Sequence, residues 1–309
     1  MKVSKEKKSS AAGLIIVVLA IALSQSGLFR THDKQQNQDA NQPAIEIIQD
    51  VPEADQSSTI AYPTDQSSTT NTASYRVDRM EIPRVFTSGE GQRIDYTGHS
   101  LYYNEDMRTP VWVAWEITRE EASQKKVDRE VEFTPDPMID GVKAYYYDYN
   151  SSGYDRGHMA PAGDMKWDSK AMEEVFYMSN ICPQNHDFNA GAWLTTENMA
   201  RRIARQYGSV YVVCGPIVTD NKYGTIGEHK VTVPDAFFKA FLIKDGGEYS
   251  AIGIVMYNTS ERQLLKASAM TVDELEEKCG LDLFTSLDRT IQDEVEARIN
   301  WSKWGKWGI

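Results

Sequence analysis

Residues 154–164 read YDRGHMAPAGD, and residues 179–189 read SNICPQNHDFN. The first stretch places His158 directly after Gly157, with Arg156 two residues before the histidine. An imidazole is suited to proton transfer, because its unperturbed pKa is near neutrality. A single histidine is more often a structural hydrogen-bonding group than a catalytic one, so its role depends on the residues that surround it.

A helix is expected to follow the second stretch, over residues 190–207, because Gly208 is a typical residue at a helix end. Four side chains at intervals of four form one stripe: Asn189, Trp193, Glu197 and Arg201. Each step of four advances about 40° around the axis, so the stripe occupies one face. From the residues alone, a functional face and a solvated charged face with one packed tryptophan remain equal alternatives.

These residue types match the needs of hydrolytic phosphoryl transfer. A water molecule must lose a proton to a base, a metal must stabilise the charge on the phosphate, and cations must orient it. Asn189 would be a weak neutral ligand, so Mg²⁺ would be bound largely through water and substrate oxygens. Glu197 would then accept hydrogen bonds from that water.

At these positions the sequence resembles the DNA/RNA non-specific endonucleases, the ββα-metal nucleases that include mitochondrial endonuclease G. The resemblance covers most of the chain, from about residue 102 to residue 284. It rests on DRGHMAP at residues 155–161 and SNICPQ at residues 179–184, followed by Asn189, Gly191, Trp193 and Glu197. Two motifs in the order and spacing of the family make catalysis the leading interpretation.

The resemblance implies a role for individual residues. His158 is the general base, Asn189 is the direct protein ligand of Mg²⁺, with Mn²⁺ as a substitute, and Glu197 orders the water around the metal. Residues implied to contact the scissile phosphate or to support the substrate are Arg156, Arg201, Arg129 and Asn180. DNA and RNA are the implied substrates, and the implied products carry 5′-phosphates.

The fold class expected from the strand and helix patterns is α+β, because strands dominate without regular βαβ alternation. Residues 236–243 and 250–255 predict a hairpin around Asp245-Gly246-Gly247. Further predicted elements are strands at residues 111–117 and 210–214 and a helix at residues 271–279. The resemblance adds a central antiparallel sheet flanked by helices, with a ββα-metal motif.

The N-terminal region predicts a location outside the cytoplasm. Four lysines among the first eight residues precede an apolar run at residues 11–23. This pattern is typical of an export signal, although Leu28 and Phe29 lengthen it towards a single-span anchor. We predict that residues 1–29 are an export signal or a membrane anchor, so the protein would be anchored facing outwards, or periplasmic or secreted after cleavage.

Residues 30–75 predict a disordered acidic linker, because a stretch this rich in polar residues cannot bury enough apolar area to fold. Residues 76–309 then form the nuclease domain. The chain has 33 basic and 45 acidic residues among its 309, a net charge of −12 that argues against binding nucleic acid by bulk electrostatics. Residues 31–74 carry seven of the acids and one lysine, so local arginines can still bind a phosphate.

The alternative interpretation is a membrane-tethered nucleic-acid-binding or structural module that has kept the fold without catalysis. The three cysteines allow at most one disulfide. The C-terminal WSKWGKW, residues 301–307, is expected either to stack on bases or to pack against the domain. No protein partner is predicted, and the oligomeric state stays open.

Overall fold

The computed structural model describes residues 79–85, 91–129 and 132–309. They belong to one compact unit, Asn71–Ile309. The predicted export signal or anchor and the whole of the predicted linker lie outside these residues. Among the helices of the described residues, none has the length and apolar character needed to span a membrane.

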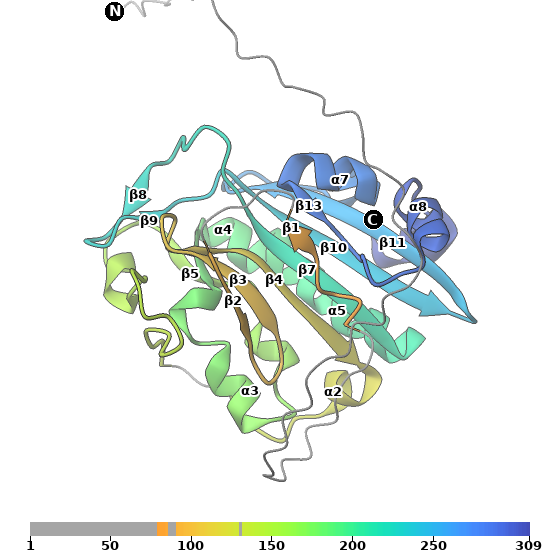
Figure 1. The fold of residues 1–309 in the computed structure, drawn as a ribbon, viewed down its shortest axis with the longest axis horizontal. Coiled ribbons are helices and arrows are strands. Elements are labelled where there is room, and N and C mark those ends of the chain that lie inside the picture. Colours follow the sequence, from red (N-terminus) through yellow and green to blue (C-terminus); the bar gives the residue numbers. More distant parts are fainter. Residues whose placement is uncertain (1–78, 86–90, 130–131) are drawn as a thin grey trace, which may run out of the picture. The chain divides into compact units, whose positions relative to one another are not determined.

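A seven-stranded antiparallel sheet forms the centre of the unit, in the strand order β12-β11-β10-β7-β4-β3-β2 (Figure 1). Its strands are β2 (Gln92–Asp95), β3 (Ser100–Asn104), β4 (Thr109–Thr118), β7 (Ser209–Ile217), β10 (Ala236–Asp245), β11 (Glu248–Tyr257) and β12 (Ala269–Met270). The predicted strands at residues 111–117 and 210–214 are confirmed as parts of β4 and β7. The α+β class and the central antiparallel sheet are therefore confirmed.

Alternation along β4 contributes side chains to two of the apolar cores of the described residues. Val113, Trp115 and Ile117 belong to one apolar cluster, and Trp112 and Ala114 belong to the other. Successive side chains of a strand point to opposite faces, so one apolar run supplies both cores. A strand buried on both faces has no polar side, which explains the nearly continuous apolar sequence of β4.

Helices cover both faces of this sheet (Figure 1). Helix α5 (Leu194–Tyr207) supplies Met199 and Ile203 to the first core, and α7 (Val272–Cys279) supplies Leu275 to the second. The layered packing buries the apolar stripe of each helix against the sheet. One face of α5 is thereby fixed towards β4 and β7, which leaves its N-terminal end to build the site described below.

The predicted hairpin of β10 and β11 is confirmed, with Asp245 paired to Glu248 across the turn. Gly246 and Gly247 have φ angles of 60° and 97°. Side chains rarely adopt positive φ at two successive residues, so this tight two-residue turn requires its glycines.

The helix predicted at residues 271–279 is confirmed as α7. Thr271 accepts a hydrogen bond from the Glu274 amide in a capping box, and Gly280 ends the helix in the left-handed conformation. Other short elements are β1 (Arg84–Val85), α2 (Arg119–Ser123), η1 (Tyr146–Tyr149), η2 (Ala162–Asp164), α3 (Ser169–Glu174), η3 (Met178–Asn180), β8 (Thr225–Ile226), β9 (Val231–Thr232), α6 (Leu265–Ser268), β13 (Leu281–Asp282), α8 (Arg289–Glu296), α9 (Trp301–Trp304) and η5 (Gly305–Trp307).

The C-terminal tryptophans mainly pack against the domain. Trp304 is fully buried, and its indole Nε1 donates a hydrogen bond to Ser250 Oγ at 2.9 Å. This packing favours the structural interpretation of residues 301–307 over base stacking. The three cysteines are all free.

Candidate active site

A cleft of about 200 Å³ gathers most of the predicted site residues. Its lining includes five of them, Arg129, Arg156, His158, Asn189 and Glu197. These residues come from a loop, a strand and a helix that are distant in the sequence. The remaining lining residues are Pro161, Ala162, Gly163, Ala190 and Leu194.

A pair of short strands places the histidine at this cleft. Strand β5 (Asp155–His158) runs antiparallel to β6 (Ile181–Gln184), and a helical segment follows β6. Gly157 leaves no room for a side chain, because a Cβ atom there would lie 2.1 Å from Gln184 Oε1. The two motifs found in the sequence are thus the two strands of one ββα unit.

His158 lies in an apolar environment at the cleft. Its ring is 8% exposed and contacts the rings of Phe133 and Phe176, with centroids 5.4 and 4.7 Å away. Burial lowers the pKa of His158 to about 3, and the positive charge of Arg129 contributes in the same direction. The imidazole is therefore neutral at physiological pH and has a lone pair that can accept a proton.

Asn189 begins a π-helical turn, η4 (Asn189–Trp193), between α4 (His186–Phe188) and α5. Its Nδ2 donates a hydrogen bond to Asp155 Oδ2 at 2.9 Å. The prediction of a single helix over residues 190–207 is therefore wrong in its first turn. A π-turn inserts a residue relative to an α-helix, and hydrophobic periodicity does not report such an insertion.

Because of this turn the predicted stripe does not form one functional face. Asn189 and Glu197 line the cleft. Trp193, between them, is fully buried, and its Nε1 donates to the His158 carbonyl oxygen at 3.0 Å. The tryptophan therefore links the helix to the strand that carries the histidine.

Glu197 is half-buried in the cleft wall, and burial raises its pKa to about 7. The nearby Lys239 counteracts this shift. The Lys239 Nζ atom lies 3.0 Å from Thr196 Oγ1 and 3.6 Å from the centroid of the Trp193 ring. Lys239 is fully buried, and it was not predicted from the sequence as a site residue. A single lysine within the apolar run AFFKAFLI is nevertheless a recognisable sign of a buried charge.

The two cleft arginines differ in how firmly they are fixed. Arg156 donates from Nε and Nη2 to the Tyr146 carbonyl oxygen at 3.0 and 2.7 Å. Its Nη2 also donates to Asn150 Oδ1 at 2.9 Å. Arg129 is exposed, with its guanidinium 5.6 Å from the centroid of the Phe176 ring. Both cations can approach an anion in the cleft, and Arg156 does so from a preorganised position.

Arg201 and Asn180 are not among the residues that line the cleft. Arg201 Nη1 forms an ion pair with the buried Asp164 carboxylate at 2.5 Å. Asn180 is fully buried, and its amide donates to the carbonyl oxygens of Ala160 and Val175 and accepts from the Ala160 amide. In this structure both side chains hold the segment after His158 in place, while the Arg201 side chain keeps 14% exposure. Substrate contact by either residue stays a prediction.

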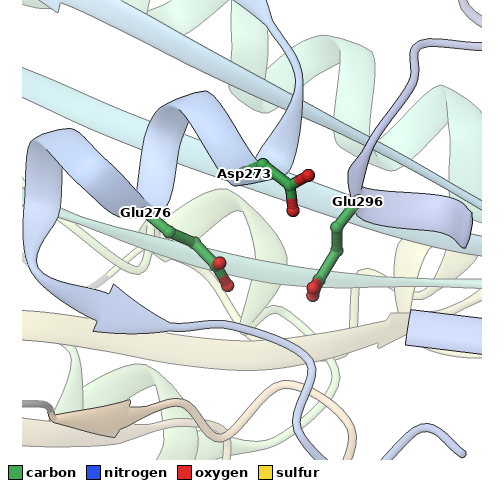
Figure 2. Close-up of side chains that lie close together, drawn as sticks. All are labelled: Asp273, Glu276 and Glu296. Atoms are coloured by element: carbon green, nitrogen blue, oxygen red, sulfur yellow. The ribbon is translucent and has the colours of Figure 1, made fainter. Parts of the chain in front are cut away.

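A second group of carboxylates lies outside the cleft, on α7 and α8. Asp273, Glu276 and Glu296 point towards one another (Figure 2), with oxygens within 4.8 Å of each other. Burial raises the pKa of Glu276 to about 7 and that of Glu296 to about 8. Each of these two carboxylates already accepts a hydrogen bond, from the Leu283 amide and the Gln292 side chain respectively.

The chain is similar to known nucleases in sequence and in fold. A family model for DNA/RNA non-specific endonucleases matches residues 78–290. The chain is 33% identical over 244 residues to mitochondrial nuclease EXOG of Danio rerio, covering 74% of this chain and 70% of that protein. It is 36% identical over 211 residues to EXOG of Homo sapiens, covering 63% of this chain and 57% of that protein. A crystal structure of the EndoG/EndoGI complex aligns with a TM-score of 0.60 and 31% identity, covering 66% of this chain and 89% of that one.

The relatives correct the predicted location. Those named here and related proteins of Homo sapiens and Saccharomyces cerevisiae are mitochondrial nucleases. The prediction of an exported protein, anchored or secreted, is therefore wrong. Export signals and mitochondrial transit peptides both carry N-terminal positive charge, so the lysines at the start of the chain did not identify the targeting route.

Proposed function

Because the chain belongs to the DNA/RNA non-specific endonuclease family, we propose that it is a Mg²⁺-dependent endonuclease that cleaves both DNA and RNA and leaves 5′-phosphate ends. Family membership identifies it as a hydrolase of nucleic-acid phosphodiester bonds. The observation that supports the finer proposal is that His158, Asn189 and Glu197 line one cleft.

His158 is proposed to be the general base. Its imidazole is neutral at pH 7, so it can take a proton from a water molecule that attacks the phosphorus atom. The low pKa weakens the base in the free protein. An anionic phosphate in the cleft would raise that pKa, because a nearby negative charge favours the protonated imidazole.

The donor atoms of the cleft fit a hard divalent cation. The Asn189 amide gives its NH₂ group to Asp155, so the Oδ1 oxygen is the atom left for a cation. Asn189 would hold Mg²⁺, and Mn²⁺, which accepts the same oxygen ligands, would substitute for it. The bound ion would stabilise negative charge on the phosphate and on the departing oxygen.

The other cleft residues have supporting roles in this proposal. The Glu197 carboxylate accepts hydrogen bonds from water in the cleft, and Arg156 and Arg129 neutralise the phosphate oxygens. Arg156 is proposed to orient the phosphate, because its guanidinium is already fixed by the Tyr146 carbonyl oxygen.

The test is a gel assay of the full chain on duplex DNA, single-stranded DNA and RNA, with Mg²⁺ and with EDTA. We expect all three substrates to be degraded with Mg²⁺ and none with EDTA. Cleavage that persists in EDTA would contradict the metal mechanism. A folded protein that degrades none of the three with Mg²⁺ would instead favour the non-catalytic module.

A further inference from the structure

Four exposed apolar side chains lie on the segment that leads to Arg156. The segment of residues 138–147 carries Met138, Val142, Tyr146 and Tyr147, which are 40–54% exposed. Isolated exposed apolar residues are ordinary, but a cluster on one segment suggests a binding surface. We call the two tyrosines, with their neighbours Tyr145 and His229, the tyrosine platform.

The rings of the tyrosine platform contact one another. Tyr145 stacks on Tyr147 with centroids 5.2 Å apart and planes at 21°, and the Tyr145 centroid lies 4.5 Å from that of His229. Tyr146 meets Tyr147 edge-on, with centroids 5.4 Å apart. The exposed rings are therefore packed against neighbouring rings before any ligand arrives.

A buried carboxylate fixes the base of this platform. Asp148 Oδ1 lies 2.9 Å from His229 Nδ1, and Asp148 Oδ2 accepts a hydrogen bond from the Tyr145 amide at 2.8 Å. The Asp148 side chain is fully buried. Rigid aromatic side chains lose little conformational entropy when a ligand binds, which makes a preorganised platform an efficient binding surface.

The backbone of the platform contacts one residue of the cleft. The Tyr146 carbonyl oxygen accepts two of the three hydrogen bonds that orient Arg156, and Arg156 lines the cleft. A strand whose phosphate lies at Arg156 therefore has its neighbouring nucleotides within reach of the two exposed rings.

We propose that Tyr146 and Tyr147 stack on nucleobases next to the scissile phosphate, in single-stranded or locally opened nucleic acid. This proposal rests on the proposed function, because it takes the ligand of the cleft to be a polynucleotide. Stacking on an aromatic ring is tolerant of sequence, since every base has a π-face. The platform would hold the strand through its bases while the arginines hold its phosphate.

The test separates bases from phosphates. The full chain in EDTA, which prevents turnover, is titrated into fluorescent oligodeoxythymidine and into a strand of equal length built from abasic residues. Wild type should bind the thymidine strand more tightly. The double variant Tyr146→Ala, Tyr147→Ala should lose about 30-fold or more in affinity for the thymidine strand and little for the abasic strand.

Two controls belong to this experiment. Tyr146→Phe with Tyr147→Phe keeps both rings and should keep the wild-type preference. Trp301→Ala removes an aromatic side chain that is 46% exposed but does not line the cleft, and it should bind both strands as wild type does. Circular dichroism checks that each variant is folded.

The outcomes distinguish the two proposals. Equal affinity of wild type for both strands would overturn the proposal that Tyr146 and Tyr147 stack on bases. An equal loss of affinity for both strands in the alanine variant would overturn it as well. Failure of wild type to cleave any nucleic acid with Mg²⁺ would overturn the proposed function, whereas the binding comparison needs no turnover and would still decide whether bases stack on the tyrosines.

Discussion

The Asp155 carboxylate accepts a hydrogen bond from the Asn189 side chain at 2.9 Å, and this contact joins strand β5 to the π-turn at the cleft. A carboxylate can only accept, so the contact fixes which end of the Asn189 amide faces Asp155. The same Oδ2 atom lies 2.9 Å from His186 Nδ1. Asp155 therefore orients the proposed metal ligand without itself lining the cleft.

Asp155→Ala is expected to weaken metal binding. Without the carboxylate the Asn189 amide can rotate, so the Mg²⁺ concentration that gives half-maximal activity should rise about 10- to 100-fold. Cleavage rates measured across a Mg²⁺ titration test this. His186→Ala is the control, because that exposed side chain touches the same oxygen without meeting the cleft. An unchanged Mg²⁺ requirement in Asp155→Ala would refute the orienting role.

His158→Ala is expected to lower the cleavage rate about 100- to 10,000-fold, the usual contribution of a positioned general base. The unfolding temperature should fall by a few degrees, because the ring contacts with Phe133 and Phe176 are lost. Single-turnover cleavage and thermal melting are measured on the same preparation. Full activity in this variant would exclude His158 as the base.

Arg201→Ala is expected to act through stability. Removing the guanidinium leaves the Asp164 carboxylate buried without its partner, which should lower the free energy of unfolding by about 3–5 kcal/mol. Urea denaturation measures this, and Arg262→Ala, at an exposed arginine, is the control. If Arg201→Ala is as stable as wild type but binds substrate poorly, the role implied by the family resemblance is the correct one.

The carboxylates of α7 and α8 predict a dependence of stability on pH. The folded-state pKa of Glu296, about 8, is above its ordinary value of 4.5. The folded state therefore binds this proton more tightly, so stability is greatest at low pH and falls as pH rises from about 5 to 8. Glu296→Gln should reduce this fall by about 1–2 kcal/mol.

Urea denaturation at about pH 5 and about pH 8 measures this dependence, with Glu277→Gln as the control on the exposed side of α7. If the free energy of unfolding of Glu296→Gln depends on pH as that of wild type does, the three carboxylates are not the source of the pH dependence. The prediction concerns stability alone, since these residues lie outside the cleft.

The sequence was sufficient for the elements with strong local signals. The capping box at Thr271 and the paired glycines after Asp245 determine where a helix begins and a hairpin turns, and both were predicted correctly. Motif order also predicted that His158, Asn189 and Glu197 belong together, and all three line the cleft.

Long-range electrostatics could not be predicted in the same way. Arg201 is similar in sequence to a phosphate-binding arginine, yet its partner, Asp164, is 37 residues away and is recognised only once the chain is folded. Lys239, on strand β10, donates a hydrogen bond to Thr196 on helix α5, 43 residues earlier in the chain. Local sequence patterns indicate which face of a helix or strand is apolar. They do not indicate which buried charged side chains form contacts in the folded protein.

The π-turn makes the site sensitive to chain length as well as to composition. Deleting one residue between Asn189 and Trp193 would restore α-helical phase, which rotates Asn189 by about 100° around the axis relative to Glu197. No substitution can reproduce that displacement. A designed helix that is to carry Asn189 and Glu197 in the same arrangement must therefore include the additional residue of the π-turn. On a regular α-helix the two side chains would point in different directions.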